Sequence, residues 1–100
     1  MKKNPHAAHI ARLEAIMDVL GYGDYGGQGR FAKEIGIAPK NFNHAIQGYP
    51  LSTTVAFRIK ERFKITTDFL WFGDPAGLAV ACERDLRAWQ RRTGRRIFSD

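Results

Sequence analysis

The sequence has 100 residues, the length of one small domain, so it cannot hold a catalytic domain beside a regulatory one. Hydrophobic residues make up 44% of the chain and charged residues 26%, a balance that excludes intrinsic disorder. The single cysteine, Cys82, excludes an internal disulfide and is typical of a reducing compartment. No apolar run reaches the ~18 residues that span a bilayer, and the N-terminus lacks the apolar stretch of a signal peptide. We therefore expect a cytoplasmic protein with no membrane segment.

The charge is the first indication of a partner. Sixteen Lys and Arg against ten Asp and Glu give a net charge of +6 and a pI near 9.9. Seven basic residues and only two acidic ones lie between Gln28 and Lys64, and six arginines lie between Arg84 and Arg96. Clustered positive charge attracts phosphate backbones, so the pattern favours nucleic acid as the partner.

The first half of the chain predicts two helices separated by glycines. Residues 8–20 form the first helix, because apolar side chains recur there at three- and four-residue steps. Residues 21–29 contain five glycines and read as a loop that no helix would tolerate. A short second helix follows, from about Gln28 or Arg30 to Ile35. The buried face of the first helix is predicted to consist of Ile10, Leu13, Ile16, Met17 and Leu20.

The next two helices are predicted from residues that are typical of helix starts and stops. Pro39 suits the first position of a third helix that reaches Ile46 or Gln47 and stops at Gly48. Ser52 is a good N-cap for a fourth helix that runs to Phe63. We expect the fourth helix to bury Val55, Ala56, Ile59 and Phe63.

The remaining chain predicts two more helices and a tail. Thr66 caps a short fifth helix over residues 68–72. A sixth helix runs from Leu78 to about Arg92, and residues 93–100 read as a tail.

No constellation of residues predicts catalysis, a cofactor or a metal. Gly21, Gly23 and Gly26 match G-x-G-x-x-G, but a dinucleotide site needs a preceding strand and none is predicted. His6 and His9 are three residues apart, yet a structural zinc site needs four ligands, so we expect two solvated side chains. The sequence therefore predicts a protein that is not an enzyme.

The stretch from Gln28 to Gly48 carries the functional prediction. Two short helices joined by a turn with Gly36 form the geometry that places a second helix in the DNA major groove. With Phe42, Ala45 and Ile46 turned inward, the third helix presents polar side chains that bond phosphates or base edges. The alternative is the ordinary polar face of any surface helix. The outward set is Lys40, Asn41, Asn43, His44 and Gln47.

This stretch resembles the helix-turn-helix of the lambda-repressor-like (Xre-type) regulators, Q-x-x-[LF]-A-x-x-[LI]-G-[VI]-S. The similarity continues through residues 48–52, 55–57, 65–66 and 68–75 and covers about residues 8–78. Ala38 departs from the family pattern where a Ser or Thr cap is usual, so Pro39 must set the helix start. Ile46 replaces a commonly acidic residue, and the glycine loop is longer than typical. The matching positions are Gln28, Phe31, Ala32, Ile35, Gly36, Ile37 and Gly48.

The resemblance implies an all-α, five-helix lambda-repressor-like DNA-binding domain over residues 1–78, with a C-terminal helical extension and basic tail over residues 79–100. It implies a bacterial or phage transcriptional regulator that binds an operator in double-stranded DNA, with the recognition helix at about residues 39–47. Because a domain of this size contacts few bases, we expect a homodimer, at least on DNA. Lys40, Asn41 and His44 would face base edges, and Gln28 would hold a phosphate. The implied DNA-binding residues are Gln28, Arg30, Pro39, Lys40, Asn41, Asn43, His44, Gln47 and Tyr49.

Three questions stay open at this point. The same fold supports an antitoxin-like module that neutralises a partner protein and binds DNA secondarily; a basic membrane-surface helix at the C-terminus is a weaker alternative. The apolar residues of the sixth helix either form a dimer contact or dock on the core near Trp71 and Phe72. The four last arginines are either an accessory phosphate contact or a solvated tail. The residues concerned are Leu78, Val80, Leu86, Trp89, Arg91, Arg92, Arg95 and Arg96.

Overall fold

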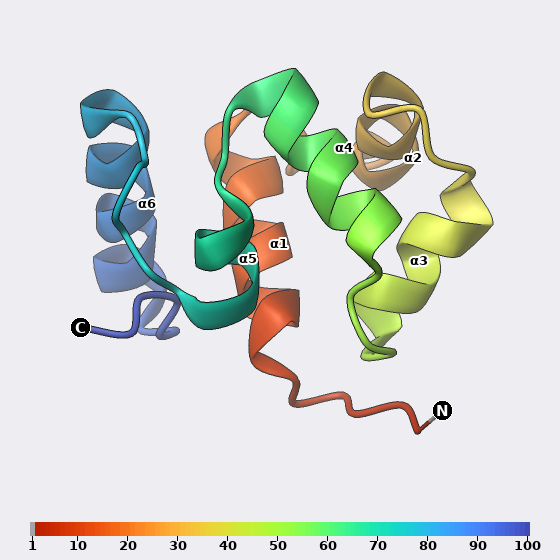
Figure 1. Ribbon diagram of the computed structural model, residues 1–100, viewed down its shortest axis with the longest axis horizontal. Helices are drawn as coiled ribbons and strands as arrows, with labels where there is room; N and C mark the ends of the chain where they lie inside the picture. The colour runs from red at the N-terminus through yellow and green to blue at the C-terminus, as the bar shows by residue number, and fades with distance from the viewer. Residues whose placement is uncertain (1) are drawn as a thin grey trace.

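Six α-helices make up the regular structure of residues 2–100, the part of the chain that the computed structural model describes (Figure 1). This described part contains no strand, which confirms the all-α prediction. The helices are α1 (Ala8–Val19), α2 (Gly27–Glu34), α3 (Pro39–Gln47), α4 (Thr53–Phe63), α5 (Thr67–Phe72) and α6 (Val80–Thr93).

Helix α1 is the centre of the packing. In Figure 1, α2, α3 and α4 lie on one side of it and α6 on the other, so that α3 and α6 occupy opposite edges of the molecule. Leu13 and Ile16 of α1 are completely buried, and Ile10 and Met17 nearly so, as the apolar periodicity predicts. Leu20 lies just beyond the end of α1 and is only half-buried.

The turn between α2 and α3 depends on Gly36. Its φ of +75° is left-handed backbone that favours glycine. The Gly36 N–H donates to Lys33 O (3.1 Å) and the Ile37 N–H to Ala32 O (2.9 Å). These two bonds satisfy the last carbonyls of α2, and Ile37 after the turn is buried in the core. At Ala38 no side chain caps α3, and Pro39 occupies the first turn, also as predicted.

The glycine-rich segment is more structured than its composition predicts. Helix α2 begins at Gly27 and includes Gly29, so the prediction that this whole segment is loop is wrong at its end. A Cβ on Gly27 would lie 1.9 Å from the Tyr22 carbonyl oxygen, so the close approach of the loop requires a glycine there. Tyr22 in turn packs edge-on against Phe31 at 5.3 Å between ring centroids. Tertiary contacts thus offset the poor helix propensity of these glycines.

Side-chain caps begin α4 and α5 where the sequence predicts them. Ser52 Oγ accepts from the Val55 N–H at 3.2 Å, and Thr66 Oγ1 accepts from the Phe69 N–H at 3.1 Å. Of the predicted inner face of α4, three side chains are buried and Phe63 is half-buried, stacked on Phe31.

Helix α6 docks on its own chain. Leu86 and Trp89 are buried, and Trp89 Nε1 donates to Asp18 of α1 at 2.7 Å. These two residues therefore belong to the core and are not available for contact with a second copy. Helix α6 also begins at Val80 rather than at the predicted Leu78, and Val80 is 86% exposed.

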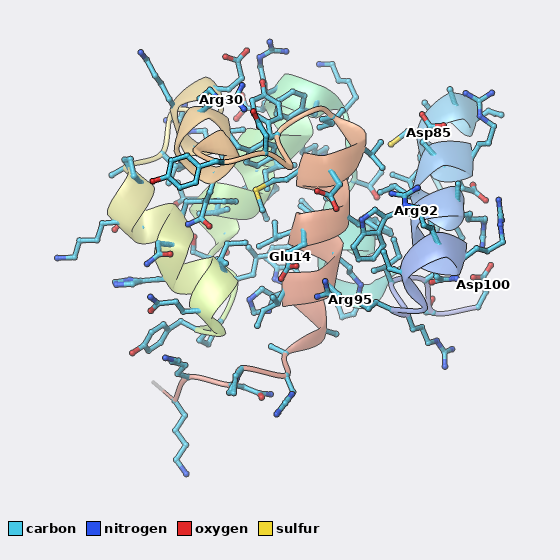
Figure 2. The ribbon with its side chains drawn as sticks, turned by 180° about the vertical axis from the view of Figure 1, so that it is seen from behind. Glu14, Arg30, Asp85, Arg92, Arg95 and Asp100 are labelled. Carbon is cyan, nitrogen blue, oxygen red and sulfur yellow. The ribbon has the colours of Figure 1, made fainter. Side chains whose placement is uncertain are left out.

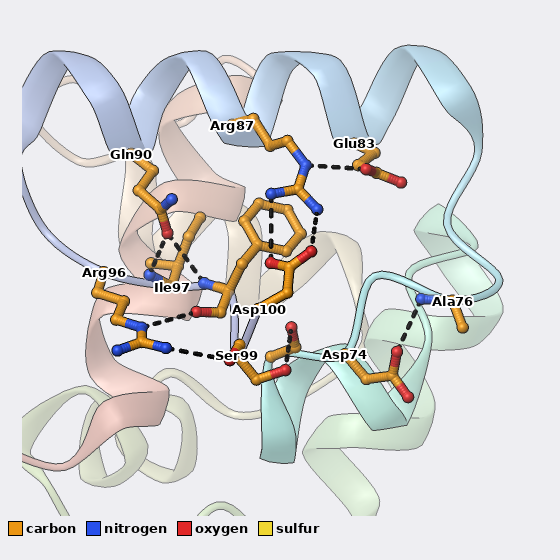
Figure 3. A network of polar contacts seen from close by, with 11 residues as sticks. Asp74, Ala76, Glu83, Arg87, Gln90, Arg96, Ile97, Ser99 and Asp100 are labelled. Atoms are coloured by element: carbon orange, nitrogen blue, oxygen red, sulfur yellow. Dashed lines mark hydrogen bonds and ion pairs between the residues drawn. The ribbon is translucent and has the colours of Figure 1, made fainter.

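Residues 97 and 98 are buried in the core and hold residues 95–100 against it, so the prediction of a tail is wrong there (Figure 3). Ile97 and Phe98 are each only 1% exposed. Gln90 Oε1 accepts from both of their backbone N–H groups, at 2.8 and 3.0 Å. Arg87 holds Asp100 at 2.8 Å and lies 4.2 Å from the centre of the Phe98 ring. We call residues 95–100 the C-terminal strap.

Arg12 joins the strap to the rest of the core. Its buried guanidinium donates to Ile97 O at 3.0 Å and to Trp71 O at 3.0 Å, with a longer bond to Leu70 O. Burial lowers the pKa of Arg12 from its ordinary value. Carbonyl oxygens from α5 and from the strap thus solvate a charge on α1, which ties three segments together.

Candidate nucleic-acid interface

Helices α2 and α3 form one rigid pair of short helices. Phe31 of α2 and Phe42 of α3 are completely buried, and their ring centroids are 5.3 Å apart. Ala32 of α2, a small residue, is also completely buried. Arg62 of α4 pairs with Glu34 and so ties α4 to the end of α2. The orientation of α3 is therefore set by the core rather than by a loop.

The outer face of α3 is polar and contains no carboxylate. Its exposed residues are Lys40, Asn41, His44 and Gln47, with Pro39 exposed at the start, whereas Phe42 and Ala45 are buried. Asn43 and Tyr49 are half-buried at the border of this face, as is Ile46, which the sequence placed in the buried stripe. These exposed side chains donate hydrogen bonds or both donate and accept, and their spacing places them along one side of a helix. We call Lys40, Asn41, His44 and Gln47 the α3 face.

Gln28 and Asn43 act as a pair. Gln28 Nε2 donates to Asn43 Oδ1 at 2.9 Å, which joins the start of α2 to the middle of α3. One amide hydrogen and the carbonyl oxygen of Gln28 remain for other partners. Gln28 therefore bridges α2 and α3, and the phosphate contact that the resemblance implies stays a prediction.

The guanidinium of Arg30 contacts residues of the preceding glycine-rich segment. It forms an ion pair with Asp24 and lies 5.6 Å from the centre of the Tyr22 ring. Figure 2 shows it on the α2 side of the molecule, seen from behind. Of the predicted DNA-binding residues, Arg30 is the one whose positive charge already has a carboxylate partner.

A groove separates α3 from the start of α4. Its volume is about 400 Å³. It is lined by Asn41 and His44 of α3, by Tyr49 between the helices and by Thr54 of α4, together with apolar residues. The His44 and Tyr49 rings are tilted against each other at 5.3 Å. Thr54 was not among the predicted site residues, because the sequence does not show that α4 begins beside α3.

The N-terminal residues lie against α3, which the sequence does not predict. The Asn4 N–H donates to Gly48 O at 2.9 Å, so residues 2–7 run past the C-terminal end of α3 (Figures 1 and 2). His9 Nε2 donates to Ala45 O at 2.9 Å, and His9 is half-buried. The expectation of two solvated histidines is therefore wrong for His9, while His6 is exposed.

The four C-terminal arginines have different surroundings in the structure. Arg95 pairs with Glu14 at 2.8 Å, which together with nearby Asp18 raises the pKa of Arg95 (Figure 2). Arg96 donates to Phe98 O and Ser99 O. Arg91 and Arg92 are exposed and have no carboxylate partner among residues 2–100, and they lie on α6, away from α3 (Figure 1). The four arginines do not form one cluster on a flexible end.

Other kinds of site are not built in the described residues. Among residues 2–100, no group of three or more His, Cys, Asp or Glu side chains is placed to hold a metal ion. Cys82 is half-buried, and burial, with a smaller effect from Asp85, raises the pKa of its thiol. Within the same described range, no helix has the length and apolar character needed to cross a bilayer.

Comparison with known proteins adds no relative. No protein-family model, curated protein or solved structure matches this chain.

Proposed function

We propose that this protein binds double-stranded DNA through α3 and regulates transcription as a bacterial or phage repressor of the lambda-repressor-like, Xre-type class. The observation that carries the proposal is the α3 face, a row of exposed polar side chains on a helix whose opposite side is locked into the core. Asn pairs bidentately with adenine, and Lys donates to guanine N7 and O6. Such a helix fits the major groove, where these base edges are accessible.

The charge around the α3 face supports the same proposal. Lys33 and Arg58 are exposed beside the α2–α3 turn, and a Cβ on Gly36 would lie 3.5 Å from Arg58 Nη1. These cations have no ion-pair partner within residues 2–100. Positive side chains on either side of a reading helix hold phosphates, while the helix supplies base contacts. We expect phosphate contacts to dominate the affinity and to make it depend steeply on salt.

The experiment is selection of bound duplexes from a random DNA pool, followed by titration of the preferred and a scrambled duplex at several salt concentrations. Enrichment of one short motif, bound more tightly than its scrambled form, supports the proposal. A palindromic motif further indicates a homodimer, because half-site symmetry mirrors protein symmetry. Equal binding to all sequences, or no binding to any duplex, would contradict the proposed sequence-specific DNA binding.

A second function is favoured by a separate observation, an exposed apolar surface. Phe57, Phe72 and Val80 are 47%, 66% and 86% exposed. A groove of about 630 Å³ next to Phe57 is lined by residues of α4 and by Thr66 and Gly77. Exposed apolar side chains beside a groove are typical of protein-interaction surfaces, which fits the antitoxin-like alternative. A stable complex with a co-expressed partner, formed equally well by variants of the α3 face, would favour this function.

A further inference from the structure

We propose that residues 2–7 form an N-terminal arm that holds Lys2 and Lys3 against DNA phosphates next to the C-terminal end of α3. This inference rests on the proposed function. It adds a contact that lies outside the two-helix unit and outside the DNA-binding residues that the resemblance implies.

Backbone contacts hold the arm in place. The Asn4 N–H donates to Gly48 O at 2.9 Å, and the approach is so close that a Cβ on Gly48 would lie 2.1 Å from Asn4 O. Gly48 has a φ of +108°, a conformation that few other residues adopt. The end of α3 is therefore shaped both to stop the helix and to receive the arm.

Two turns within the arm direct it toward α1. Asn4 Oδ1 accepts from the His6 N–H at 3.0 Å, and Asn4 O accepts from the Ala7 N–H at 3.0 Å. The His9–Ala45 bond joins α1 to α3 one turn further along. The arm thus has a defined path between α1 and α3, and only its first residues extend beyond it.

The positive charge of the arm is not neutralised by an ion pair within residues 2–100. Lys2 and Lys3 are exposed, and within residues 2–100 no carboxylate forms an ion pair with either of them. If α3 lies in the major groove, the end of α3 comes close to the sugar-phosphate backbone that borders the groove. Lysine is a compact positive charge on a flexible stem, suited to phosphates rather than to bidentate reading of bases. We therefore assign the arm to phosphate contact.

The test compares two variants that each remove two positive charges. The first is Lys2→Ala with Lys3→Ala, and the matched control is Arg91→Ala with Arg92→Ala on α6, at the opposite edge of the molecule from α3. Each phosphate contact adds about 0.9 to the slope of log K against log salt. We expect the arm variant to lower that slope by about 1.8 and to keep the preferred motif, while the control keeps the wild-type slope.

Two results would contradict the proposed phosphate contact of the arm. In the first, the arm variant keeps the wild-type slope on the preferred duplex. In the second, the control lowers the slope by as much as the arm variant, which would mean that only net charge matters. If the wild-type protein binds no duplex, the proposed function fails instead, so the two failures are distinguishable.

A tethered cleavage experiment gives the position of the arm. An iron chelate is attached to Lys3→Cys in a Cys82→Ser background, with Arg91→Cys as the control site. We expect cleavage from residue 3 at a few consecutive nucleotides next to the preferred motif, and none from residue 91. Cleavage from residue 3 that is absent, or spread evenly along the duplex, would contradict a held arm.

Discussion

The arginines differ sharply in what surrounds each guanidinium. Arg12 is buried among carbonyls, whereas Arg30, Arg62, Arg87 and Arg95 have carboxylate partners. The net charge of +6 therefore does not show which basic side chains are free to meet a partner. The sequence predicts that the chain is basic, but pairings such as Arg95 with Glu14 join residues 81 positions apart, so only the folded chain defines them.

Three side chains of the α3 face should each contribute to the base preference. Replacing Lys40, Asn41 or His44 by Ala should cost about 1–3 kcal/mol on the preferred duplex and relax the preference at one base pair. The reason is that each loses hydrogen bonds to a base edge. The measurement is the affinity of each variant for the preferred and the scrambled duplex. Well-folded variants that all keep wild-type discrimination would exclude α3 as the reading helix.

Two controls separate reading from anchoring and from folding. Gln28→Ala should weaken binding to all sequences alike, and because Gln28 also holds Asn43, a change of preference at one position would assign a reading role to Asn43. Phe42→Ala removes a completely buried ring that packs against Phe31, and should cost about 3–5 kcal/mol of fold stability. Circular dichroism distinguishes this loss of fold from loss of contact.

At the scale of the helices, local signals predict the chain well between residues 36 and 72. Ser52 and Thr66 cap helices, and Gly36, Gly48 and Gly73 follow helix ends with positive φ. These signals act within four or five residues, so the sequence shows them directly. Helix α6 and the strap were predicted less well, because Gln90 and Arg12 hold the strap through contacts that no local pattern contains.

The C-terminal strap should be a structural element. Phe98→Ala should lower the free energy of unfolding by about 3–5 kcal/mol, because a buried aromatic ring leaves a cavity beside Phe69, 5.1 Å away. Val80→Ala is the matched control, since Val80 is exposed and should change stability by about 0.5 kcal/mol or less. Urea unfolding followed by circular dichroism measures both. Equal midpoints for the two variants would mean that the strap is dispensable.

At the scale of the whole molecule, the polar and apolar surfaces have separate places. The α3 face and the arm lie at one edge, and α6 lies at the other (Figure 1). The exposed apolar residues Phe57, Phe72 and Val80 come from α4, α5 and α6 and do not belong to the α3 face. A protein contact and a DNA contact can therefore occur on one molecule at the same time, which is what a dimer on a symmetric operator requires.

We expect two copies of the chain on a palindromic operator and a monomer when the protein is free. Leu86 and Trp89 are buried within one chain, so they cannot contribute to an interface between copies, and a stable interface buries roughly 800 Å² per partner. DNA raises the effective concentration of two copies on adjacent half-sites, so a weak contact suffices there. Sedimentation of the protein alone and with the selected duplex measures both states.

Phe57→Asp should lower the cooperativity with which the second copy binds the palindrome, without changing binding to a single half-site. The reason is that a carboxylate at a shared apolar contact costs desolvation energy. One chain on a full palindrome would contradict the dimer, and unchanged cooperativity in Phe57→Asp would place the contact between copies elsewhere.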